Sequence, residues 1–268
     1  MTVRSGRVRR VRRLADRSFR HAQREFVAEG PQAVREALAV DGVVLEVFAD
    51  AEATDRHPEL RTRADATGVP WQVVKVEVVA AMSQTVQPQG VVARCGFVDV
   101  PLEALLARVP RLVAVCADMR DPGNAGSVLR CADAAGAEGV VLVGDSVDPY
   151  NSKAVRASAG SLFHIDVVVE PDPARAIGAL RTRGLRVIAA DGRAEIDLDT
   201  AADGGFLIEP TAWLFGNEAW GLPDAVRDLA EVSVRVPIYG RAESLNLAAA
   251  AAVCLFASAR AQRAALAP

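Results

Sequence analysis

Short apolar runs alternate with helical patterns along most of this 268-residue chain. From residue 111 onward the apolar runs are rich in Val, Ile and Leu and are nearly continuous, a pattern typical of parallel strands that are covered on both faces. The second half is therefore predicted to be an α/β domain with a mainly parallel sheet. Its expected strands lie near 111–118, 139–145, 164–169, 185–191, 212–218 and 232–237.

The first half predicts a smaller α/β unit. Strand-like runs occur at 43–48, 72–76 and 90–95, between helical patterns near 31–40, 57–67 and 75–83. Pro31 stands just inside a helix start, where its missing N–H would have no partner in any case. Pro101 and Pro110 bracket a short helix that is predicted to link the two halves.

Charge is distributed unevenly along the chain. The net charge is −3, yet the first 24 residues hold nine arginines and one acid, Asp16, a net of +8, which leaves −11 for the rest. A basic segment on an acidic body favours a phosphate-rich partner, although solvated surface arginines would give the same composition. We expect three parts: a basic arm at 1–24, a small domain at 25–105 and a larger domain at 111–268.

Several classes of protein are disfavoured. The four cysteines form no C-x-x-C pair and no histidine stands at metal-ligand spacing, so we expect reduced thiols and no metal site. The longest apolar run, 247–257, is too short to cross a bilayer core of ~30 Å. Charges interrupt every candidate signal-sequence core between 12 and 36. A cytoplasmic protein is predicted, although an arginine-rich start would also suit an organelle transit peptide.

Three polar junctions interrupt the apolar pattern where a strand meets a helix, at 121–137, 214–223 and 236–256. Each combines Gly with Asn, Ser or Glu. Backbone groups at such junctions approach a ligand closely, because Gly has no Cβ and helix starts present unpaired N–H groups. The strand ends of α/β sheets are where ligands usually bind. The junctions therefore predict a ligand site.

A structural interpretation of each junction is also possible. Asn124 and Ser244 would serve as N-caps, and Glu218 would cap a helix after a turn at Gly216. Arg130, on its own, is typical of a solvated helix charge. Residue types alone leave both interpretations open.

In order and spacing the three junctions resemble motifs 1, 2 and 3 of the SpoU (TrmH-type) family of RNA ribose 2′-O-methyltransferases, in the SPOUT superfamily. The resemblance covers roughly 111–262. It implies S-adenosylmethionine as cofactor, a homodimer, and a deep C-terminal trefoil knot, which ordinary chain statistics would not predict. The stretches 25–38 and 84–93 resemble, more loosely, the RNA-binding domain of ribosomal RNA members, so 25–105 is expected to bind the RNA substrate.

The resemblance also implies roles for individual residues. The expected catalytic group is Asn124, Arg130, Glu218, Ser244 and Asn246. The cofactor is expected at Leu214, Phe215, Gly216, Asn217, Val236, Ile238, Gly240, Leu245 and Leu247. Arg130 suits a phosphate through its planar fork of donors, but a pKa above ~12 makes it a poor general base, so its part in activating the ribose hydroxyl stays open. RNA contacts are expected at Arg17, Arg20, Arg24 and Arg156.

Together with the family resemblance, these features predict an S-adenosylmethionine-dependent RNA ribose 2′-O-methyltransferase that acts on ribosomal RNA. One alternative is a tRNA ribose methyltransferase. The other is a noncatalytic RNA-binding or ribosome-assembly protein with the same fold, which the presence of the whole catalytic group disfavours.

Overall fold

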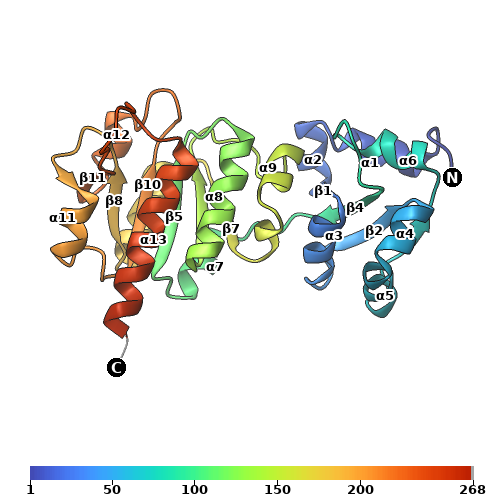
Figure 1. Cartoon of the computed structure of the whole chain (residues 1–268), viewed down its shortest axis with the longest axis horizontal. Coiled ribbons are helices and arrows are strands. Elements are labelled where there is room, and N and C mark those ends of the chain that lie inside the picture. Colours follow the sequence, from blue (N-terminus) through green and yellow to red (C-terminus); the bar gives the residue numbers. More distant parts are fainter. Residues whose placement is uncertain (267–268) are drawn as a thin grey trace. The chain divides into compact units, whose positions relative to one another are not determined.

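The computed structural model describes residues 1–266, which form two compact units (Figure 1). Unit 1 contains residues Met1–Val98 and Asp148–His164, and unit 2 contains residues 99–147 and those from 165 onward. The chain therefore enters unit 2, returns to unit 1 at residue 148 and leaves it again after residue 164. The small domain that was expected to be continuous includes this returning segment.

Unit 2 is built on a seven-stranded sheet in which every pairing is parallel, in the order β7-β6-β5-β10-β8-β11-β9. The predicted α/β class and parallel sheet are confirmed, and each of the six expected strands is present. The strands are β5 (Leu112–Ala117), β6 (Gly139–Val143), β7 (Asp166–Glu170), β8 (Arg186–Ala190), β9 (Ile196–Asp197), β10 (Thr211–Phe215) and β11 (Val232–Arg235).

Helices cover both faces of this sheet, as near-continuous apolar strands require. The long helices α8 (Pro122–Ala135) and α13 (Leu247–Leu266) lie side by side over β5 and β10 (Figure 1). On that face the Nε1 atom of Trp213 donates to the Ser258 hydroxyl of α13 at 2.9 Å, which satisfies the buried indole. The remaining helices of the unit are α7 (Leu102–Ala107), α10 (Pro173–Thr182), α11 (Leu198–Asp203) and α12 (Asp224–Arg227).

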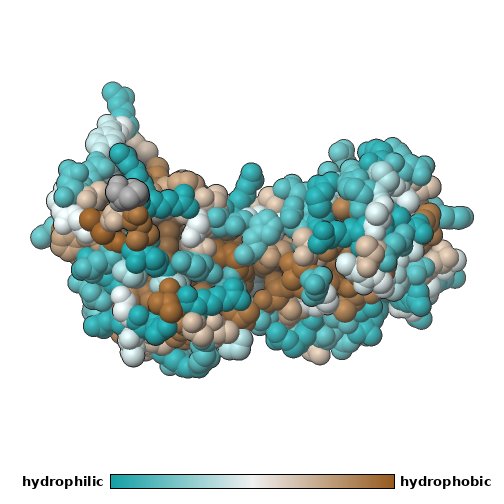
Figure 2. Space-filling model, turned by 90° about the horizontal axis from the view of Figure 1, so that it is seen from below, coloured by the Kyte–Doolittle hydropathy of each residue, from teal (hydrophilic) through white to brown (hydrophobic). Residues whose placement is uncertain are grey.

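The opposite face of the sheet carries a single apolar cluster. Leu214 and the alternate residues of β5 and β8 pack there against Leu105 of α7 and Ile177 of α10. Because helices cover both faces of the sheet, a ligand can reach the strands only at their ends. Figure 2 shows brown patches scattered over an otherwise teal surface. In unit 2 the exposed large hydrophobic side chains include Val169, Phe206, Trp220, Ile238, Tyr239, Leu245, Val253 and Phe256.

Unit 1 contains a four-stranded mixed sheet in the order β1-β4-β2-β3, with β4 antiparallel to both of its neighbours. Its strands are β1 (Glu25–Glu29), β2 (Val44–Ala49), β3 (Trp71–Val73) and β4 (Val91–Gly96). Its helices are α1 (Gly6–Arg13), α2 (Arg17–Gln23), α3 (Pro31–Leu38), α4 (Ala51–Arg56), α5 (Pro58–Ala66), α6 (Val76–Met82), α9 (Ser152–Ala157) and the 3₁₀ turn η1 (Ser161–Phe163).

The arginine-rich segment, expected as an arm at 1–24, is part of the core of unit 1. Helix α1 buries Val8 and Val11, and Leu14 follows it into the same cluster. These residues recur every third position and form one apolar stripe, which packs with strand residues such as Phe48. Residue 24 is therefore not a structural boundary.

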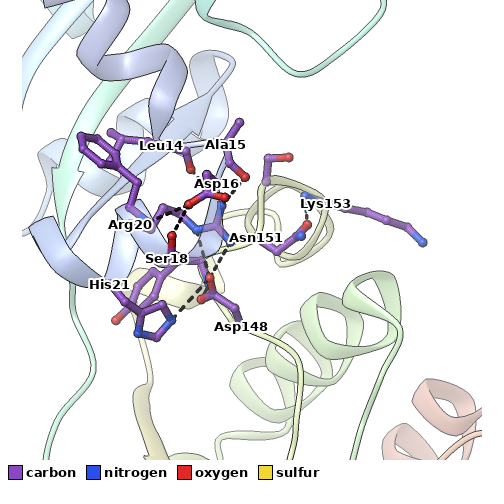
Figure 3. A network of polar contacts seen from close by, with 12 residues as sticks. Leu14, Ala15, Asp16, Ser18, Arg20, His21, Asp148, Asn151 and Lys153 are labelled. Carbon is purple, nitrogen blue, oxygen red and sulfur yellow. Dashed lines mark hydrogen bonds and ion pairs between the residues drawn. The ribbon is translucent and has the colours of Figure 1, made fainter.

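Arg20 ties α2 to the returning segment (Figure 3). Its side chain is buried, and its Nε and Nη2 atoms donate to one carboxylate oxygen of Asp148 at 2.9 and 2.6 Å. Its Nη1 atom donates to the carbonyls of Leu14 and Ala15 at 2.8 and 2.7 Å. Because the guanidinium is satisfied by these bonds, the pair fixes residues 148–164 to the N-terminal helices.

We predict that Arg20→Ala destabilises the protein strongly, because it leaves the Asp148 carboxylate buried without its partner. Breaking a buried ion pair costs about 3–5 kcal/mol. The matched control is Arg17→Ala on the same helix, where an exposed arginine should change stability by no more than about 0.5 kcal/mol. Urea unfolding followed by circular dichroism measures both. Equal midpoints for the two variants would contradict the structural role of Arg20.

Candidate active site at the carboxyl ends of the central strands

The polar junctions meet where the central strands of unit 2 end. Strand β10 lies between β5 and β8, and β8 also pairs with β11. Strand β5 leads into α8, β10 leads into residues 216–222, and β11 leads into the segment 236–246 that precedes α13. Since α13 packs on α8, the third junction returns to the first.

One chain of hydrogen bonds joins all three junctions. Asn124 donates from Nδ2 to Glu218 Oε1 at 3.0 Å, and Asn246 donates from Nδ2 to Asn124 Oδ1 at 3.1 Å. The backbone N–H groups of Asp121 and Arg120 also donate to the Glu218 carboxylate, at 3.3 and 3.4 Å. Three of the five predicted catalytic residues therefore lie together, although they are far apart in the sequence.

The helix caps differ from those that the structural interpretation proposed. Asp121, not Asn124, caps α8, and accepts a hydrogen bond from the Asn124 N–H at 2.9 Å. Asn246, not Ser244, caps the start of α13, because its Oδ1 atom accepts a hydrogen bond from the Ala248 N–H at 2.9 Å. The Asn124 side chain is therefore available to bond Glu218.

Glu218 is held as a carboxylate. Partial burial by itself raises the pKa of Glu218, but hydrogen bonds from the Asn124 side chain and from backbone N–H groups outweigh it, so the pKa lies below its ordinary value of 4.5. A carboxyl with a lowered folded-state pKa stabilises the fold at neutral pH, and that contribution is lost as the pH falls through the lowered value. Glu218 is thus a fixed negative charge and a weak general base.

Gly216 and Asn217 shape the turn that presents Glu218. A Cβ at Gly216 would lie 2.3 Å from the carbonyl carbon of Gly221 and 2.4 Å from the Leu222 nitrogen. Asn217 and Gly221 exchange backbone hydrogen bonds of 2.9 and 3.0 Å. The Asn217 Nδ2 atom donates to the Asp118 carbonyl at 2.7 Å, so its side chain anchors motif 2 to the end of β5.

The residues predicted to bind the cofactor fall into two groups. Leu214 and Phe215 are fully buried in β10, so only their backbone can serve a ligand. The second group lies on an open segment with exposed apolar side chains, at Ile238 and Leu245, beside backbone polar groups. Apolar side chains next to backbone donors and acceptors fit a molecule that carries both an aromatic base and polar groups. The second group is Val236, Ile238, Gly240, Leu245 and Leu247.

Two predicted catalytic residues lie outside the hydrogen-bond chain. Arg130 and Ser244 are exposed, and within residues 1–266 neither bonds Asn124, Glu218 or Asn246. Arg130 is six residues beyond Asn124 on α8, about 9 Å along the helix axis at ~1.5 Å per residue. Arg130 therefore lies apart from the hydrogen-bond chain of Asn124, Glu218 and Asn246.

The thiol at the end of β5 is not a candidate nucleophile. Burial raises the pKa of Cys116, at the end of β5, to about 12, which makes it an unreactive thiol. The described part of the chain contains no cluster of three or more metal-ligating side chains and no helix that is long and apolar enough to cross a membrane. Trp220, two residues beyond Glu218, is a 59% exposed indole that was not among the predicted site residues, although an aromatic residue within a Gly-rich junction was a visible signal.

The predicted RNA contacts have different environments. Arg17 is exposed, and the Arg24 guanidinium lies over the Phe97 ring, 5.0 Å from its centroid. Arg156 lies 3.6 Å from the buried carboxylate of Glu29. The prediction for Arg20 is wrong, because its guanidinium is buried against Asp148 and cannot reach a phosphate.

Comparison with known proteins matches both units. The model of the SpoU rRNA Methylase family matches residues 111–256, and that of the MRM3-like substrate binding domain matches residues 6–93. The 23S rRNA (guanosine(2553)-2′-O)-methyltransferase RlmP of Bacillus subtilis is 30% identical over 259 residues, covering 95% of this chain and 96% of its own.

Two solved structures are informative. An AdoMet-bound rRNA methyltransferase from Sinorhizobium meliloti superimposes with a TM-score of 0.84 at 30% identity, covering 97% of this chain and 96% of its own. A structure described as giving insight into 2-OH methylation of C/U34 on tRNA has a TM-score of 0.51 at 32% identity, and covers 58% of this chain and 99% of its own.

We predict that Gly216→Ala disrupts the site, because the added Cβ would collide with backbone atoms that cannot rotate away. Gly240→Ala is the matched control, since a Cβ there meets nothing within 4 Å. Thermal unfolding should show a clearly lower midpoint for Gly216→Ala. The control should stay within about 0.5 kcal/mol of the unchanged protein. A Gly216→Ala variant as stable as the control would contradict the close approach of residues 216 and 221.

Proposed function

We propose, because this chain belongs to the SpoU rRNA methylase family, that it transfers the methyl group of S-adenosylmethionine to a ribose 2′-hydroxyl of ribosomal RNA. The observation that carries the proposal is the hydrogen-bond chain from Glu218 through Asn124 to Asn246, which connects the family's three motifs at one edge of the sheet. The Bacillus subtilis relative is named for 23S rRNA, which is therefore the proposed substrate.

Ribosomal RNA is favoured over tRNA by the extent of the similarity. The neighbour described for tRNA corresponds to 58% of this chain, and 99% of that neighbour is covered. The rRNA methyltransferase from Sinorhizobium meliloti corresponds to 97%. We assign RNA binding to unit 1, which includes the match to a substrate binding domain, and methyl transfer to unit 2.

The reaction forms a bond between the ribose O2′ and the methyl carbon, breaks the bond between sulfur and that carbon, and releases the O2′ proton. The cofactor supplies a methyl group on a positively charged sulfur. Positioning of the two reactants is the main task of the protein. The amide groups of Asn124 and Asn246 each use one N–H in the hydrogen-bond chain and keep another to donate to the ribose.

The charged residues divide the remaining work. Glu218 keeps its negative charge at neutral pH, holds Asn124 in place and stabilises a cationic group brought to this edge. Arg130 binds a phosphate next to the target ribose, as its fork of donors suits. Neither residue is suited to take the ribose proton, since Glu218 has a lowered pKa and a guanidinium stays protonated. Exposed Ser244 is assigned to the incoming ribose.

The cofactor pocket is proposed to consist of residues 214–217 and 236–247, arranged in the trefoil knot that the family resemblance implies. The buried β10 backbone would bind the polar part, and Ile238 and Leu245 would pack on the adenine. The enzyme is proposed to act in the cytoplasm as a homodimer. Support for the dimer comes from Val253 and Phe256, which are 42% and 50% exposed and lie one turn apart on α13.

We predict that Arg130→Ala leaves S-adenosylmethionine binding intact and lowers single-turnover methyl transfer by about tenfold or more, given the ~1.5–3 kcal/mol of a charged hydrogen bond. Arg181→Ala, an exposed change on α10 across the sheet, is the control. Calorimetry measures the first quantity and labelled methyl incorporation into ribosomal RNA the second. Full activity of Arg130→Ala would remove it from the site, and an inactive unchanged protein would refute the function.

We also predict that Phe256→Glu shifts the protein from dimer to monomer, because the new charge would be buried without a partner at the interface. Val169→Glu, on the edge strand β7, introduces the same change at another exposed apolar position. Light scattering gives the mass of each variant. A dimer that persists in Phe256→Glu, or a monomeric unchanged protein, would contradict the proposed interface.

A further inference from the structure

The arginines of the N-terminal helices separate by environment. Arg7 and Arg10 are used within the fold, since they pair with the buried carboxylates of Glu46 and Glu25 at 3.1 and 2.8 Å. Arg20 is buried. In contrast, Arg9, Arg12 and Arg13 are exposed, and within residues 1–266 none of these three forms an ion pair with a carboxylate. That last set, on the outward side of α1, carries charge that the fold does not use.

The same three arginines border two hollows between α1 and α2. A hollow of about 440 Å³ is lined by Arg12, Arg13 and Phe19 among others, and a hollow of about 530 Å³ by Arg9, Arg13 and Phe19. Arg13 and Phe19 stand between the two, with the guanidinium carbon 4.0 Å from the centroid of the ring. The surface therefore alternates positive charge with an aromatic–guanidinium stack.

One carboxylate, Asp16, also lines the smaller hollow. Its Oδ1 atom accepts hydrogen bonds from the Ser18 hydroxyl at 2.6 Å and from the Phe19 N–H at 2.8 Å. These bonds lower the pKa of Asp16 and orient its charge toward the start of α2. The acid fixes the α1–α2 turn, and the arginines dominate the surface around it.

We propose that this face is a subsite for unpaired nucleotides of the RNA substrate, with phosphates at Arg9 and Arg12 and a base against the Arg13–Phe19 stack. The inference rests on the proposed function and specifies where the substrate meets unit 1. Single-stranded RNA is recognised by stacking on aromatic rings and guanidinium planes together with phosphate contacts. An anionic membrane fits less well, because the apolar stripe of α1 is buried in the core and has no side chain to insert.

The test of the phosphate contacts uses the full-length protein and a fluorescent oligoribonucleotide of about 12 nucleotides. The double variant Arg9→Ala/Arg12→Ala should bind it more weakly. The plot of the logarithm of the binding constant against the logarithm of salt concentration should also become less steep by about 1.4, because each lost single-strand phosphate contact accounts for ~0.7. The control Arg56→Ala/Arg61→Ala removes two surface arginines from α4 and α5 and should leave the slope unchanged. An unchanged slope in the first variant, or an equal loss in the control, would overturn the proposal.

The test of stacking compares the single strand with an RNA duplex of the same length. Phe19→Leu keeps an apolar side chain but removes the ring, so single-strand affinity should fall about fivefold or more while duplex affinity stays constant. Arg13→Lys, which keeps the positive charge but removes the guanidinium plane, should show the same selectivity and does not depend on the packing of residue 19. Equal losses on both RNAs would overturn the stacked base.

The same variants are tested for binding to anionic phospholipid vesicles. Loss of vesicle binding without loss of RNA binding would assign the face to a membrane and overturn the proposal.

The subsite and the proposed function fail separately. If the unchanged protein binds RNA through this face but transfers no methyl group, the proposed function is wrong and the subsite stands. If it methylates ribosomal RNA and the α1 and α2 variants keep full RNA affinity and salt slope, only the subsite is wrong.

Discussion

The Glu218 carboxylate accepts hydrogen bonds from the Asn124 side chain and from the backbone at the start of α8, and the rest of the site depends on this contact. A parallel sheet brings the carboxyl ends of its strands to one edge, and the helices that follow begin there with unpaired N–H groups. A carboxylate at that edge is favoured by the positive end of the helix dipole. Gly216 permits the tight turn that delivers it, and Asn246 extends the same network to α13.

Electrostatics organise unit 1 in a different way. The sequence concentrates positive charge in its first 24 residues, but the fold uses some of these arginines internally. Arg10 neutralises Glu25 at the start of the buried strand β1, and Arg20 neutralises Asp148 on the returning segment. The arginines that remain on the outer side of α1 can meet a polyanion without losing a partner in the protein. The arginines of α1 that form no ion pair within the described residues therefore lie together on one face of the helix.

Apolar runs predicted six of the seven strands of unit 2, because burial on both faces leaves a strong local signal, whereas the two-residue strand β9 is too short to give one. Strand β1 was missed because its short sequence, EFVAE, places glutamates at both ends, and their burial depends on partners elsewhere in the chain: Arg10 and Arg94 pair with Glu25, and Arg156 lies beside Glu29. The return of 148–164 to unit 1 was also not predictable, since Arg20 and Asp148 are 128 residues apart. In the site, polar junctions indicated a ligand-binding edge, but composition could not distinguish the cap Asn246 from Ser244, nor assign Arg130 a role without the family resemblance.

The most direct test of the account is a map of ribose methylation in ribosomal RNA from cells that lack this protein. Ribose 2′-O-methylation protects the adjacent phosphodiester from alkaline cleavage, so each modified position can be read along the RNA. The account predicts that protection is lost at a discrete ribosomal RNA position and is restored by the unchanged protein, but not by a variant that combines Asn124→Ala with Glu218→Gln. An unchanged ribosomal RNA map, or full restoration by that variant, would contradict it.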